Sequence, residues 1–554
     1  MSKVLFIFSK NNSFQQWKLK STAFNTSVSK ELNLLIEKSH WALYYDHLNP
    51  VKPIKMQAPD TTAFILGNFS FQKNTFIERK EEKHWRMISY QELPDIKTVF
   101  NQLNGTYCCF DFNENNNKVS IYTDYLGFFP LYLYQDEGQI IVSSEIKLIK
   151  ELTDEKLSWN PQAIQSYLEN GHLISNQSWF IEIVRMRPAS IYSLDCETRQ
   201  LNRNYYWTWS EVSKLNRPIE ELLVSYNELF KSGISQLDQE DCNSFGVSLS
   251  GGLDSRLIAY IASKTCNLSS FSFGNKLNYE IQIAQKVAKT LDIKHEFIQI
   301  GMSNWLENRL SAFWKVDGLL HLGHLHEVPV HNYIAANYPV YYHGFFGGGI
   351  YANRSEANLA MKPSLIPKYL KLGSSPDESE DIFYSKHCID SYLIDQKIRN
   401  QSAHSIYLLS SHCKLILPFY NMNWMVLNYS IDDCLQLNHK FYLNFLNKYL
   451  PKQLLDIPWQ RTGIPPHFIF LNLLASSSRL PSIREKVAQF FGSSKHFINY
   501  NEIDQELNQW LLHFKSEIRD LGINRIPASR EIKFRLLSLV LIIKMMNKNT
   551  AHVL

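Results

Sequence analysis

Short apolar runs alternate with polar turns over the N-terminal third of the chain. Apolar runs at 63–66, 106–110 and 119–122 are separated by segments rich in Asn and Gly. Runs of this length, bounded by turn residues, are typical of β-strands. The polar stretch 113–118 predicts a hairpin loop, and the short apolar run after Met1 predicts a first strand. The chain up to about Trp209 is therefore expected to be mostly β.

A different pattern begins near Pro218. Amphipathic helical stretches alternate there with short apolar segments, at 245–249, 269–273, 295–300 and 340–342. This alternation predicts a parallel, doubly wound sheet, whose ligands bind at the carboxyl ends of its strands. Beyond about Ser355 the pattern is mainly helical, with a polar loop at 376–381. The apolar stretch 536–543 is much shorter than the roughly 20 residues of a membrane-spanning helix and predicts a buried helix.

The segment Ser250–Ser255 reads Ser-Gly-Gly-Leu-Asp-Ser and joins a predicted strand to a predicted helix. Adjacent glycines permit positive φ and let main-chain N–H groups approach an anion. The hydroxyl groups of Ser250 and Ser255 add donors, and the helix that begins near Leu253 directs its positive end to the same place. The segment therefore predicts a nucleotide-phosphate site, with a ligand-free turn as the alternative.

Asp254 narrows the expected ligand of this loop. A carboxylate repels phosphate unless a divalent cation lies between them, so Asp254 predicts Mg²⁺ bound to a polyphosphate. The loop lacks the Lys that precedes Ser or Thr in the commoner phosphate-binding loop. We therefore expect ATP and Mg²⁺ in a different arrangement.

Composition excludes several classes of partner. The 554 residues suggest two to four domains, and 45% hydrophobic with 20% charged residues is typical of a globular protein. A net charge of +4 gives no electrostatic reason to expect nucleic acid. The eight cysteines form no CxxC pair, which favours reduced thiols in the cytoplasm over a disulfide scaffold or a zinc knuckle. We expect neither a nucleic-acid nor a membrane partner.

Several other short segments read as sequence motifs. Residues 124–132 read Asp-Tyr-Leu-Gly-Phe-Phe-Pro-Leu-Tyr, 144–147 read Ser-Glu-Ile-Lys, and 206–207 read Tyr-Trp. Residues 270–274 read Ser-Phe-Ser-Phe-Gly, and 418–421 read Pro-Phe-Tyr-Asn. In this order, and with the SGGxDS loop of the ATP pyrophosphatases among them, these segments resemble the glutamine-dependent asparagine synthetases. They are also similar to the related β-lactam synthetases and lasso-peptide cyclases.

The resemblance implies an α/β protein of three parts. Residues 1–209 would form an amidohydrolase-like (Ntn-type) β-sandwich, 210–480 an ATP-pyrophosphatase domain of the adenine nucleotide α hydrolase type, and 481–554 a helical extension. It further implies an AMP-forming ligase that adenylates a carboxylate with release of pyrophosphate, and then forms an amide as an amine or ammonia attacks and AMP departs. The expected partners are small-molecule or peptide carboxylates and amines, and a homodimer is left open.

The resemblance also assigns roles to individual residues. Leu249 and Phe273 would flank the adenine, Gly344 would approach the nucleotide, and Asp254 would hold Mg²⁺. Arg461 stands where the family has a Lys that stabilises the acyl-adenylate transition state, and it keeps the charge but cannot lose a proton. The predicted catalytic residues are Asp254 and Arg461. The predicted nucleotide-binding residues are Leu249, Ser250, Gly251, Gly252, Leu253, Asp254, Ser255, Phe273 and Gly344.

The chain departs from the family at its N-terminus. Glutamine-using members expose a Cys directly after the initiator Met, whereas this chain has Ser2. Serine can act as an N-terminal nucleophile. The glutamine-holding motifs are missing, however, and Gly67-Asn68 is at best a remnant of them. We therefore favour a structural N-terminal domain over an active glutaminase.

A second departure concerns the metal site. Residues 343–349 read His-Gly-Phe-Phe-Gly-Gly-Gly, so that Phe345 and Gly348 replace two acids of the family. One of those acids shares the metal with the loop Asp, and Asp254 is left without this partner. Asp317, Glu280 and Glu356 are the candidate replacements. The loss motivates an alternative function, a catalytically degenerate nucleotide-binding scaffold or regulator. A genuine glutamine-dependent asparagine synthetase is the remaining alternative.

Three other features are open to more than one interpretation. The histidines at 321, 324, 326 and 331 match no zinc pattern, so we favour a helix or loop at the edge of the cleft. Arg399 could hold a substrate carboxylate or form a salt bridge on a helix surface. Lys440 is expected at the surface.

Overall fold

The structure of the chain is a computed structural model. It describes residues 3–9, 32–46, 50–58, 60–71, 79–81, 86–89, 99–100, 103–153, 157–235, 244–347, 381–384, 389–476 and 500–548. Ser2, Gly348, Gly349 and Glu356 lie outside these residues, as does most of the polar loop predicted at 376–381.

The first sheet is antiparallel and has the strand order β12-β10-β11-β1-β3-β2. Its first strand confirms the one predicted after Met1. The strands of this sheet are β1 (Val4–Ser9), β2 (Leu32–Glu37), β3 (Trp41–Asp46), β10 (Tyr132–Gln135), β11 (Gln139–Ser143) and β12 (Ile183–Arg185).

The second sheet has the order β14-β13-β9-β8-β5-β4-β7-β6 and is antiparallel except for the β4–β7 pair. The predicted strands at 63–66, 106–110 and 119–122 lie within β5, β8 and β9, and a turn at 114–117 confirms the predicted hairpin. The strands of this sheet are β4 (Ile54–Ala58), β5 (Thr61–Phe71), β6 (Arg79–Glu81), β7 (Arg86–Ser89), β8 (Leu103–Asn113), β9 (Lys118–Thr123), β13 (Ser190–Asp195) and β14 (Leu201–Tyr205).

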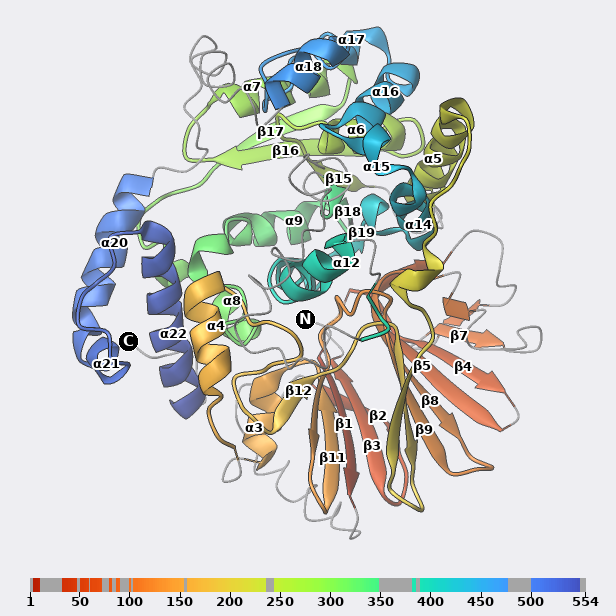
Figure 1. Cartoon of the computed structure of the whole chain (residues 1–554), viewed down its shortest axis with the longest axis vertical. Helices are drawn as coiled ribbons and strands as arrows, with labels where there is room; N and C mark the ends of the chain where they lie inside the picture. Colours follow the sequence, from red (N-terminus) through yellow and green to blue (C-terminus); the bar gives the residue numbers. More distant parts are fainter. Residues whose placement is uncertain are drawn as a thin grey trace.

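Aromatic side chains join the inner faces of these two sheets, which lie in the lower part of Figure 1. Trp41 of β3 stacks on Phe112 of β8 with ring centroids 4.1 Å apart, and Phe6 of β1 lies 5.8 Å from Phe110. Alternate residues of β8 point to this core because side chains on a strand alternate between its two faces. The predicted β-sandwich arrangement is therefore present, while its relation to amidohydrolases stays a prediction.

The third sheet is parallel throughout and has the order β17-β16-β15-β18-β19. The chain enters at the central strand, runs outward to one edge, and returns to build the other half, as a doubly wound sheet does. The four predicted strands are confirmed, whereas β19 was not predicted. The strands are β15 (Phe245–Ser248), β16 (Leu268–Gly274), β17 (Lys294–Gln299), β18 (Val340–Tyr342) and β19 (Lys414–Ile416).

Helices surround the parallel sheet and extend to the C-terminal side (Figure 1). The described α-helices are α3 (Ile146–Thr153), α4 (Pro161–Asn170), α5 (Ile219–Ile234), α6 (Asp254–Ala262), α7 (Tyr279–Thr290), α8 (Leu310–Lys315), α9 (His331–Asn337), α12 (Ile389–Leu393), α13 (Ala403–Leu409), α14 (Met422–Ser430), α15 (Asp433–Gln436), α16 (Lys440–Tyr449), α17 (Lys452–Leu455), α18 (Ile469–Ser476), α20 (Tyr500–His513), α21 (Lys515–Asp520) and α22 (Arg530–Lys548). Shorter helical turns are η2 (Trp209–Glu211), η4 (Glu307–Arg309), η5 (Leu322–His324), η6 (Val328–Val330), η9 (Ile394–Ile398) and η10 (Pro418–Tyr420).

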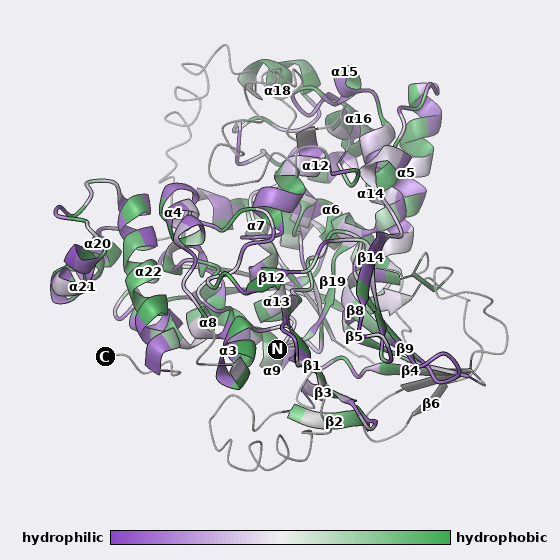
Figure 2. Ribbon diagram, turned by 60° about the horizontal axis from the view of Figure 1, so that its bottom comes forward, coloured by the Kyte–Doolittle hydropathy of each residue, from purple (hydrophilic) through white to green (hydrophobic). Residues whose placement is uncertain are grey.

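The last helix, α22, is buried along most of its length. Residues 536–542 are all buried, which confirms the helix predicted at 536–543, and Figure 2 shows its hydrophobic colouring. The helix packs against α4 and η5. Among the residues that the structure describes, no helix is long and apolar enough to cross a membrane.

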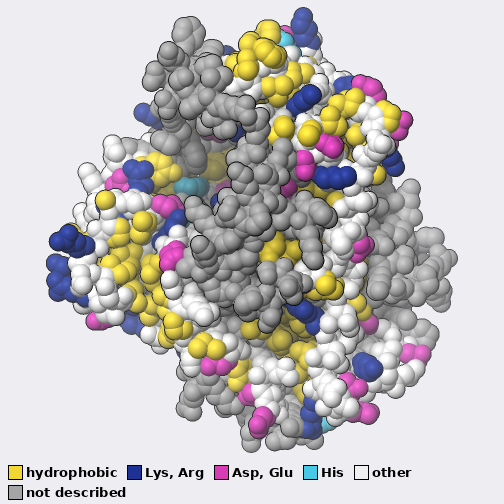
Figure 3. Space-filling model, in the orientation of Figure 1, with side chains coloured by type: hydrophobic (Ala, Val, Ile, Leu, Met, Phe, Trp, Pro, Cys, Tyr) yellow, Lys and Arg dark blue, Asp and Glu magenta, His cyan; other side chains and the backbone are white. Residues whose placement is uncertain are grey.

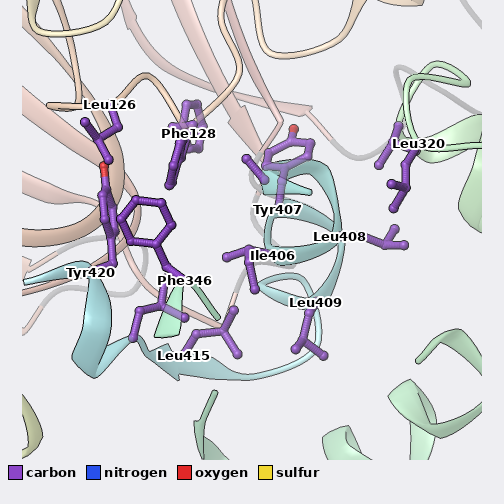
Figure 4. Close-up of a cluster of buried hydrophobic side chains, with 14 of the residues drawn as sticks. Leu126, Phe128, Leu320, Phe346, Ile406, Tyr407, Leu408, Leu409, Leu415 and Tyr420 are labelled. Atoms are coloured by element: carbon purple, nitrogen blue, oxygen red, sulfur yellow. The ribbon is translucent and has the colours of Figure 1, made fainter. Parts of the chain in front are cut away.

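Two polar side chains of the N-terminal sheets are committed to contacts with the second half of the chain. The Asn68 amide donates to the Leu415 carbonyl oxygen (3.0 Å) and accepts from the Leu415 N–H (2.9 Å), as a neighbouring strand would. Asp124 accepts the Tyr420 hydroxyl (2.9 Å) together with several main-chain N–H groups. Phe128 stacks on Tyr420 in the apolar cluster of Figure 4. The two halves therefore share one interior.

A buried charge network also crosses between the halves. Asp395 in the π-helical turn η9 lies 2.9 Å from Arg187 NH1 and 2.6 Å from Arg399 Nε. Burial alone would raise the pKa of Asp395, but the guanidinium groups of Arg187 and Arg399 hold it below its usual value. Arg399 also donates to the Met186 carbonyl oxygen (3.0 Å) and is fully buried. Arg399 thus forms the salt bridge that was one of its two predicted roles, but the bridge is buried and not on a helix surface. The other role, a contact with a substrate carboxylate, is not favoured, because the donors of Arg399 bind the protein itself.

Removal of the Asp395 carboxylate tests this network. We expect Asp395→Asn to lower the free energy of unfolding by about 3–5 kcal/mol, because it leaves the buried Arg399 guanidinium without its carboxylate partner, whereas Arg187 keeps its pair with Asp381. Equilibrium unfolding in urea, followed by tryptophan fluorescence, measures the change. The matched control is Glu220→Gln, which breaks an exposed pair with Lys448 and should cost less than about 1 kcal/mol. Equal effects in the two variants would contradict a structural role for the network.

Candidate nucleotide site

The Ser250–Ser255 loop lies between the end of β15 and the start of α6, as predicted. The hydroxyl oxygens of its two serines accept hydrogen bonds from main-chain N–H groups of the same loop. The Ser250 N–H donates to Ser255 Oγ (3.2 Å), and the Gly252 N–H donates to Ser250 Oγ (3.1 Å). The two hydroxyl oxygens are 3.2 Å apart. The hydroxyl and N–H donors of a possible anion site thus converge at the N-terminus of a nine-residue helix.

The loop glycines are needed for space and not for positive φ. Neither Gly251 nor Gly252 has φ in the left-handed region, so this part of the prediction is wrong. A Cβ on Gly251 would lie 2.6 Å from Gln460 Cβ, a distance that real Cβ atoms do not show. The segment around Gln460 therefore rests directly on the loop, and only glycine permits this approach.

Glu280 lies on the same side of the loop. Its carboxylate accepts hydrogen bonds from the Gly251 N–H and from the Gln460 side chain. Burial raises the pKa of Glu280, and those two hydrogen bonds act in the opposite direction. Gln460 in turn donates its own N–H to the Gly251 carbonyl oxygen (3.0 Å). Three segments of the chain thus meet at Gly251.

Asp254 begins α6 and receives one hydrogen bond, from the Tyr442 hydroxyl to Oδ1 (2.7 Å). Burial raises the pKa of Asp254 to about 6, and the bond from Tyr442 only partly offsets this effect. No cationic side chain contributes to this shift. A buried carboxylate whose charge is not balanced by a cation is a fitting ligand for a metal ion.

Asp254 lies next to the segment in which two acids were expected and not found. A Cβ on Gly347 would lie 3.0 Å from Asp254 Cγ, so the main chain at Gly347 lies close to the Asp254 carboxyl group. Phe345 and Phe346 lie next to Phe128 of the N-terminal half, at centroid distances of 5.7 and 5.5 Å. Figure 4 shows Phe346 beside both Phe128 and Tyr420. An aromatic contact thus takes the place of a carboxylate.

The backbone of this segment is strained at Phe346, whose φ of 74° is unusual for a bulky residue. The His343 ring holds the preceding turn, since Nδ1 accepts the Phe345 N–H (2.9 Å). Gly344 faces open space, because a Cβ there would meet nothing within 4 Å. Among the described residues there is thus room beside the Gly344 main chain, and its contact with a nucleotide stays a prediction.

Arg461 follows Gln460 and is held by two aromatic neighbours. Its NH1 group lies 2.9 Å from His439 Nε2, and its guanidinium carbon lies 5.7 Å from the Trp459 ring centroid. Burial, and secondly Arg461, lower the pKa of His439 to about 3, so His439 is neutral and accepts this hydrogen bond. Arg461 is half-buried.

A buried arginine connects this segment to the phosphate loop. Arg256, in the first turn of α6, donates to the carbonyl oxygens of Leu454 (3.0 Å), Ile457 (2.8 Å) and Pro458 (2.8 Å). The chain that leads to Arg461 is thereby fixed to the helix that carries Asp254.

The remaining predicted residues lie at the ends of β15 and β16. Leu249 is buried, its N–H donates to the Phe271 carbonyl oxygen (2.8 Å), and its carbonyl oxygen accepts the Ser272 hydroxyl (2.6 Å). Phe273 is partly buried near the end of β16, and Leu253 is buried in the core. Both strand ends face the edge of the sheet that carries the loop.

The three candidates for a second metal ligand separate clearly. Asp317 already has other partners, since it pairs with Lys147 Nζ (3.1 Å) and accepts the Ile146 N–H (2.7 Å) at the start of α3. Glu356 lies outside the described residues. Glu280 lies at the loop, although it does not contribute to the pKa shift of Asp254. Among described residues, Glu280 is thus the candidate that the structure retains.

Sequence reasoning gave no role to Tyr442, Gln460 and His439, which contact the loop or the predicted catalytic residues. It also gave none to Arg256, which binds the segment before Arg461. Gln460 adjoins Arg461 and Arg256 follows Ser255, so their places beside the motifs were the available signals. Lys440 is exposed, as expected.

Comparison with known proteins finds a match in each half of the chain. A glutamine amidotransferase domain model matches residues 88–207, and an asparagine synthase model matches residues 236–331. These matches, with the curated relatives below, support the resemblance to the asparagine synthetase family at low sequence identity.

Two curated relatives show how far this similarity extends. A putative glutamine-hydrolysing asparagine synthetase of Methanocaldococcus jannaschii is 24% identical over 260 residues, which are 44% of this chain and 50% of the relative. Asparagine synthetase 2 of Bacillus subtilis is 23% identical over 214 residues, or 36% of this chain and 28% of the relative. The chain thus matches half or less of the length of these two relatives.

Among solved structures, an NH3-dependent NAD synthetase from Campylobacter jejuni covers 26% of this chain and 61% of its own, at 14% identity and a TM-score of 0.17. A glutamine PRPP amidotransferase from B. subtilis covers 54% of this chain and 91% of its own, at 8% identity and a TM-score of 0.22. Because these TM-scores are low, neither structure supports an argument about the fold. The fold is therefore described from the strand pairing of this chain alone.

Substitutions of Gly344 and Gly251 distinguish an effect on ligand binding from an effect on the local fold. Gly344→Ala should leave the urea unfolding curve unchanged, since the added Cβ meets nothing, but it should weaken ATP binding in isothermal titration. Gly251→Ala should displace the Gln460–Arg461 segment and cost on the order of 100-fold in any turnover. Gly301→Ala, which also adds its Cβ in open space, is the control. Unchanged ATP affinity in Gly344→Ala would place the nucleotide elsewhere.

The raised pKa of Asp254 predicts a pH dependence of metal-dependent nucleotide binding. The ionised carboxylate binds the cation, so binding should be constant above pH 6 and fall up to about tenfold per pH unit below it. Asp254→Asn should remove this component. Because the nucleotide phosphates titrate in a similar range, the difference between the two proteins, measured by titration calorimetry with Mg²⁺, isolates Asp254. Parallel pH profiles would contradict its role as metal ligand.

Proposed function

We propose that the chain is an ATP-dependent ligase that adenylates a carboxylate and transfers the acyl group to an amine. The observation that carries this proposal is the Ser250–Ser255 loop at the N-terminus of α6, with the Gln460–Arg461 segment resting on it. The loop supplies donors for a pyrophosphate and a buried acid for a metal, while Arg461 supplies a permanent positive charge beside it. The match of residues 236–331 to an asparagine synthase model supports ATP as the nucleotide.

In this proposal the loop residues Ser250, Gly251, Gly252 and Ser255 hold the pyrophosphate portion of ATP. Their hydroxyl and N–H groups are bonded to one another or to Glu280, and ATP would have to exchange some of these bonds. Leu249 and Phe273 would flank the adenine at the strand ends, Leu253 supports the loop from the core, and Gly344 provides the open approach.

Asp254 would hold Mg²⁺, with Glu280 as the nearest described acid at the loop. Bound Mg²⁺ neutralises charge on the pyrophosphate, which makes it a better leaving group. A site with one carboxylate is compatible with Mg²⁺, which usually takes one or two carboxylates together with phosphate oxygens and water. The Tyr442 hydroxyl orients Asp254 for this role.

The reaction has two steps. A carboxylate oxygen of the substrate bonds to the α-phosphorus of ATP as the bond to the pyrophosphate breaks. The amine nitrogen then bonds to the acyl carbon, AMP departs, and the amine gives up a proton. Arg461 stabilises the negative charge that develops on the phosphate oxygens, and its neighbour His439 holds it in place. Since Arg461 cannot lose its proton, a different group must accept the proton of the amine.

We further propose that the amine comes from outside and that the N-terminal sheets are structural. Asn68, the remnant of a glutamine-holding motif, is fully used in its bonds with Leu415. Asp124 is similarly committed to its own turn and to Tyr420. Ser2 lies outside the described residues. No disulfide joins the described cysteines, which is compatible with the proposed cytoplasmic location.

A second function, a nucleotide-binding scaffold without turnover, is favoured by one observation. Phe345 stands at an acidic position of the family and points to Phe128, so it provides no metal ligand. Such a protein would bind ATP at the same loop but catalyse no exchange.

Exchange of labelled pyrophosphate into ATP tests the proposal, with a panel of amino acids, peptides and amino-sugar acids as carboxylates. We expect exchange with at least one of them. Asp254→Asn and Arg461→Met should each lower it by about 10²–10³-fold, and Arg461→Lys should retain more of it than Arg461→Met. Lys440→Met, at an exposed residue of the same helix as Tyr442, is the control.

Three outcomes distinguish the candidate functions. Exchange that depends on Mg²⁺ and on Asp254 supports the ligase. ATP binding without exchange, and unaffected by Mg²⁺, supports the scaffold and contradicts the ligase. Release of glutamate from glutamine that Ser2→Ala abolishes would identify a glutamine-dependent asparagine synthetase instead.

A further inference from the structure

Two of the four clustered histidines meet an acid from the last helix. His321 and His324 flank the η5 turn, and Glu531 lies in the first turn of α22. One ligand atom of each of these three side chains lies within 4.8 Å of the others. His331 belongs to a different contact, with its ring 4.9 Å from that of His412. The pattern of four histidines in the sequence therefore separates in the structure.

The helical turn explains why the two histidines converge. The His324 N–H donates to the His321 carbonyl oxygen (2.8 Å), which is the i to i+3 bond of a 3₁₀ turn. Side chains three residues apart on such a turn lie one above the other. The ring centroids of His321 and His324 are accordingly 3.9 Å apart.

His321 has unsatisfied polar atoms in the protein interior. Its exposed fraction is 0%, and neither ring nitrogen makes a hydrogen bond of acceptable geometry. Nε2 nevertheless lies 3.2 Å from Glu531 Oε1. Burying an unpaired nitrogen is unfavourable by about 1–3 kcal/mol, so a native structure that retains one calls for an explanation.

We propose that His321, His324 and Glu531 bind a divalent transition-metal ion, with Zn²⁺ the best match, and that this ion fastens α22 to the η5 turn. Two imidazoles and a carboxylate are a common donor set for zinc, with water as the fourth ligand. Ligand atoms about 2.0–2.1 Å from a tetrahedral ion are about 3.4 Å apart. The separation of 3.2 Å between His321 Nε2 and Glu531 Oε1 is close to this value.

The surroundings provide both support and entry. Arg535 donates to Glu531 Oε1 (3.1 Å) and to the Glu169 carbonyl oxygen of α4 (2.6 Å), and it thereby orients the carboxylate. Its positive charge shares that carboxylate with the metal, which moderates the affinity. The Glu531 side chain is 45% exposed, so an ion can enter from solvent. The site lies in the C-terminal helices and is independent of the proposed ligase activity.

Metal binding to the full chain, freed of any affinity tag and stripped with a chelator, tests the proposal. We expect about one Zn²⁺ per chain after dialysis, a visible absorption band with Co²⁺ in its place, and a higher midpoint of thermal unfolding with Zn²⁺. Glu531→Gln and His324→Gln should each weaken Zn²⁺ binding at least about tenfold, because loss of a ligand should cost no less than loss of an outer-shell partner.

The control is His513→Gln, which changes an exposed histidine of α20 and should bind Zn²⁺ as the wild type does. Glu531→Gln keeps an amide oxygen for Arg535, and so it remains informative if His324→Gln fails to fold. Absence of saturable Zn²⁺ binding, or equal binding by the wild type and Glu531→Gln, would overturn the proposal and leave a simple histidine–carboxylate contact.

Discussion

The carboxylate of Asp395 is the charge on which the join between the two halves depends. It receives Arg187 from the N-terminal part and Arg399 from its own helical turn, and all three side chains are buried. Such a cluster is tolerable only when every charge is matched, because each unmatched charge in the interior costs several kcal/mol. The buried Lys147–Asp317 ion pair is matched in the same way, and the buried Asn68 amide is satisfied by its hydrogen bonds with Leu415. The antiparallel sheets and the parallel sheet are thereby held in one fixed relation, with the phosphate loop above their junction (Figure 1).

Much of the fold could be predicted, because strand and helix patterns are local. The strands at 63–66, 106–110 and 119–122, four strands of the parallel sheet, and the buried C-terminal helix all follow from apolar runs and their boundaries. The three-residue strand β19 could not, because its identity depends on pairing with β18 and on the Asn68 amide, both distant in sequence. The burial of Arg399 was missed for the same reason, since nothing local shows that a charged side chain is buried among partners some 200 residues away.

The candidate site was predicted in part. The Ser250–Ser255 loop, Gly344 and Arg461 carry motif signals, and the structure gives their local geometry while their roles stay predictions. Tyr442 and Glu280 reach the loop from helices whose sequences have no distinctive pattern, so only the fold could reveal them. The outer surface adds little, since basic and acidic side chains are interspersed on the face in Figure 3, and exposed apolar residues such as Phe470 and Leu471 gather on α18.

Arg256 has a mechanical consequence for whatever this site binds. One guanidinium fixes three carbonyl groups at 454–458 to the first turn of α6, so the chain that leads to Arg461 and the helix that carries Asp254 form a single rigid unit. Binding of a ligand that contacts both segments would therefore cost little conformational entropy for ordering them.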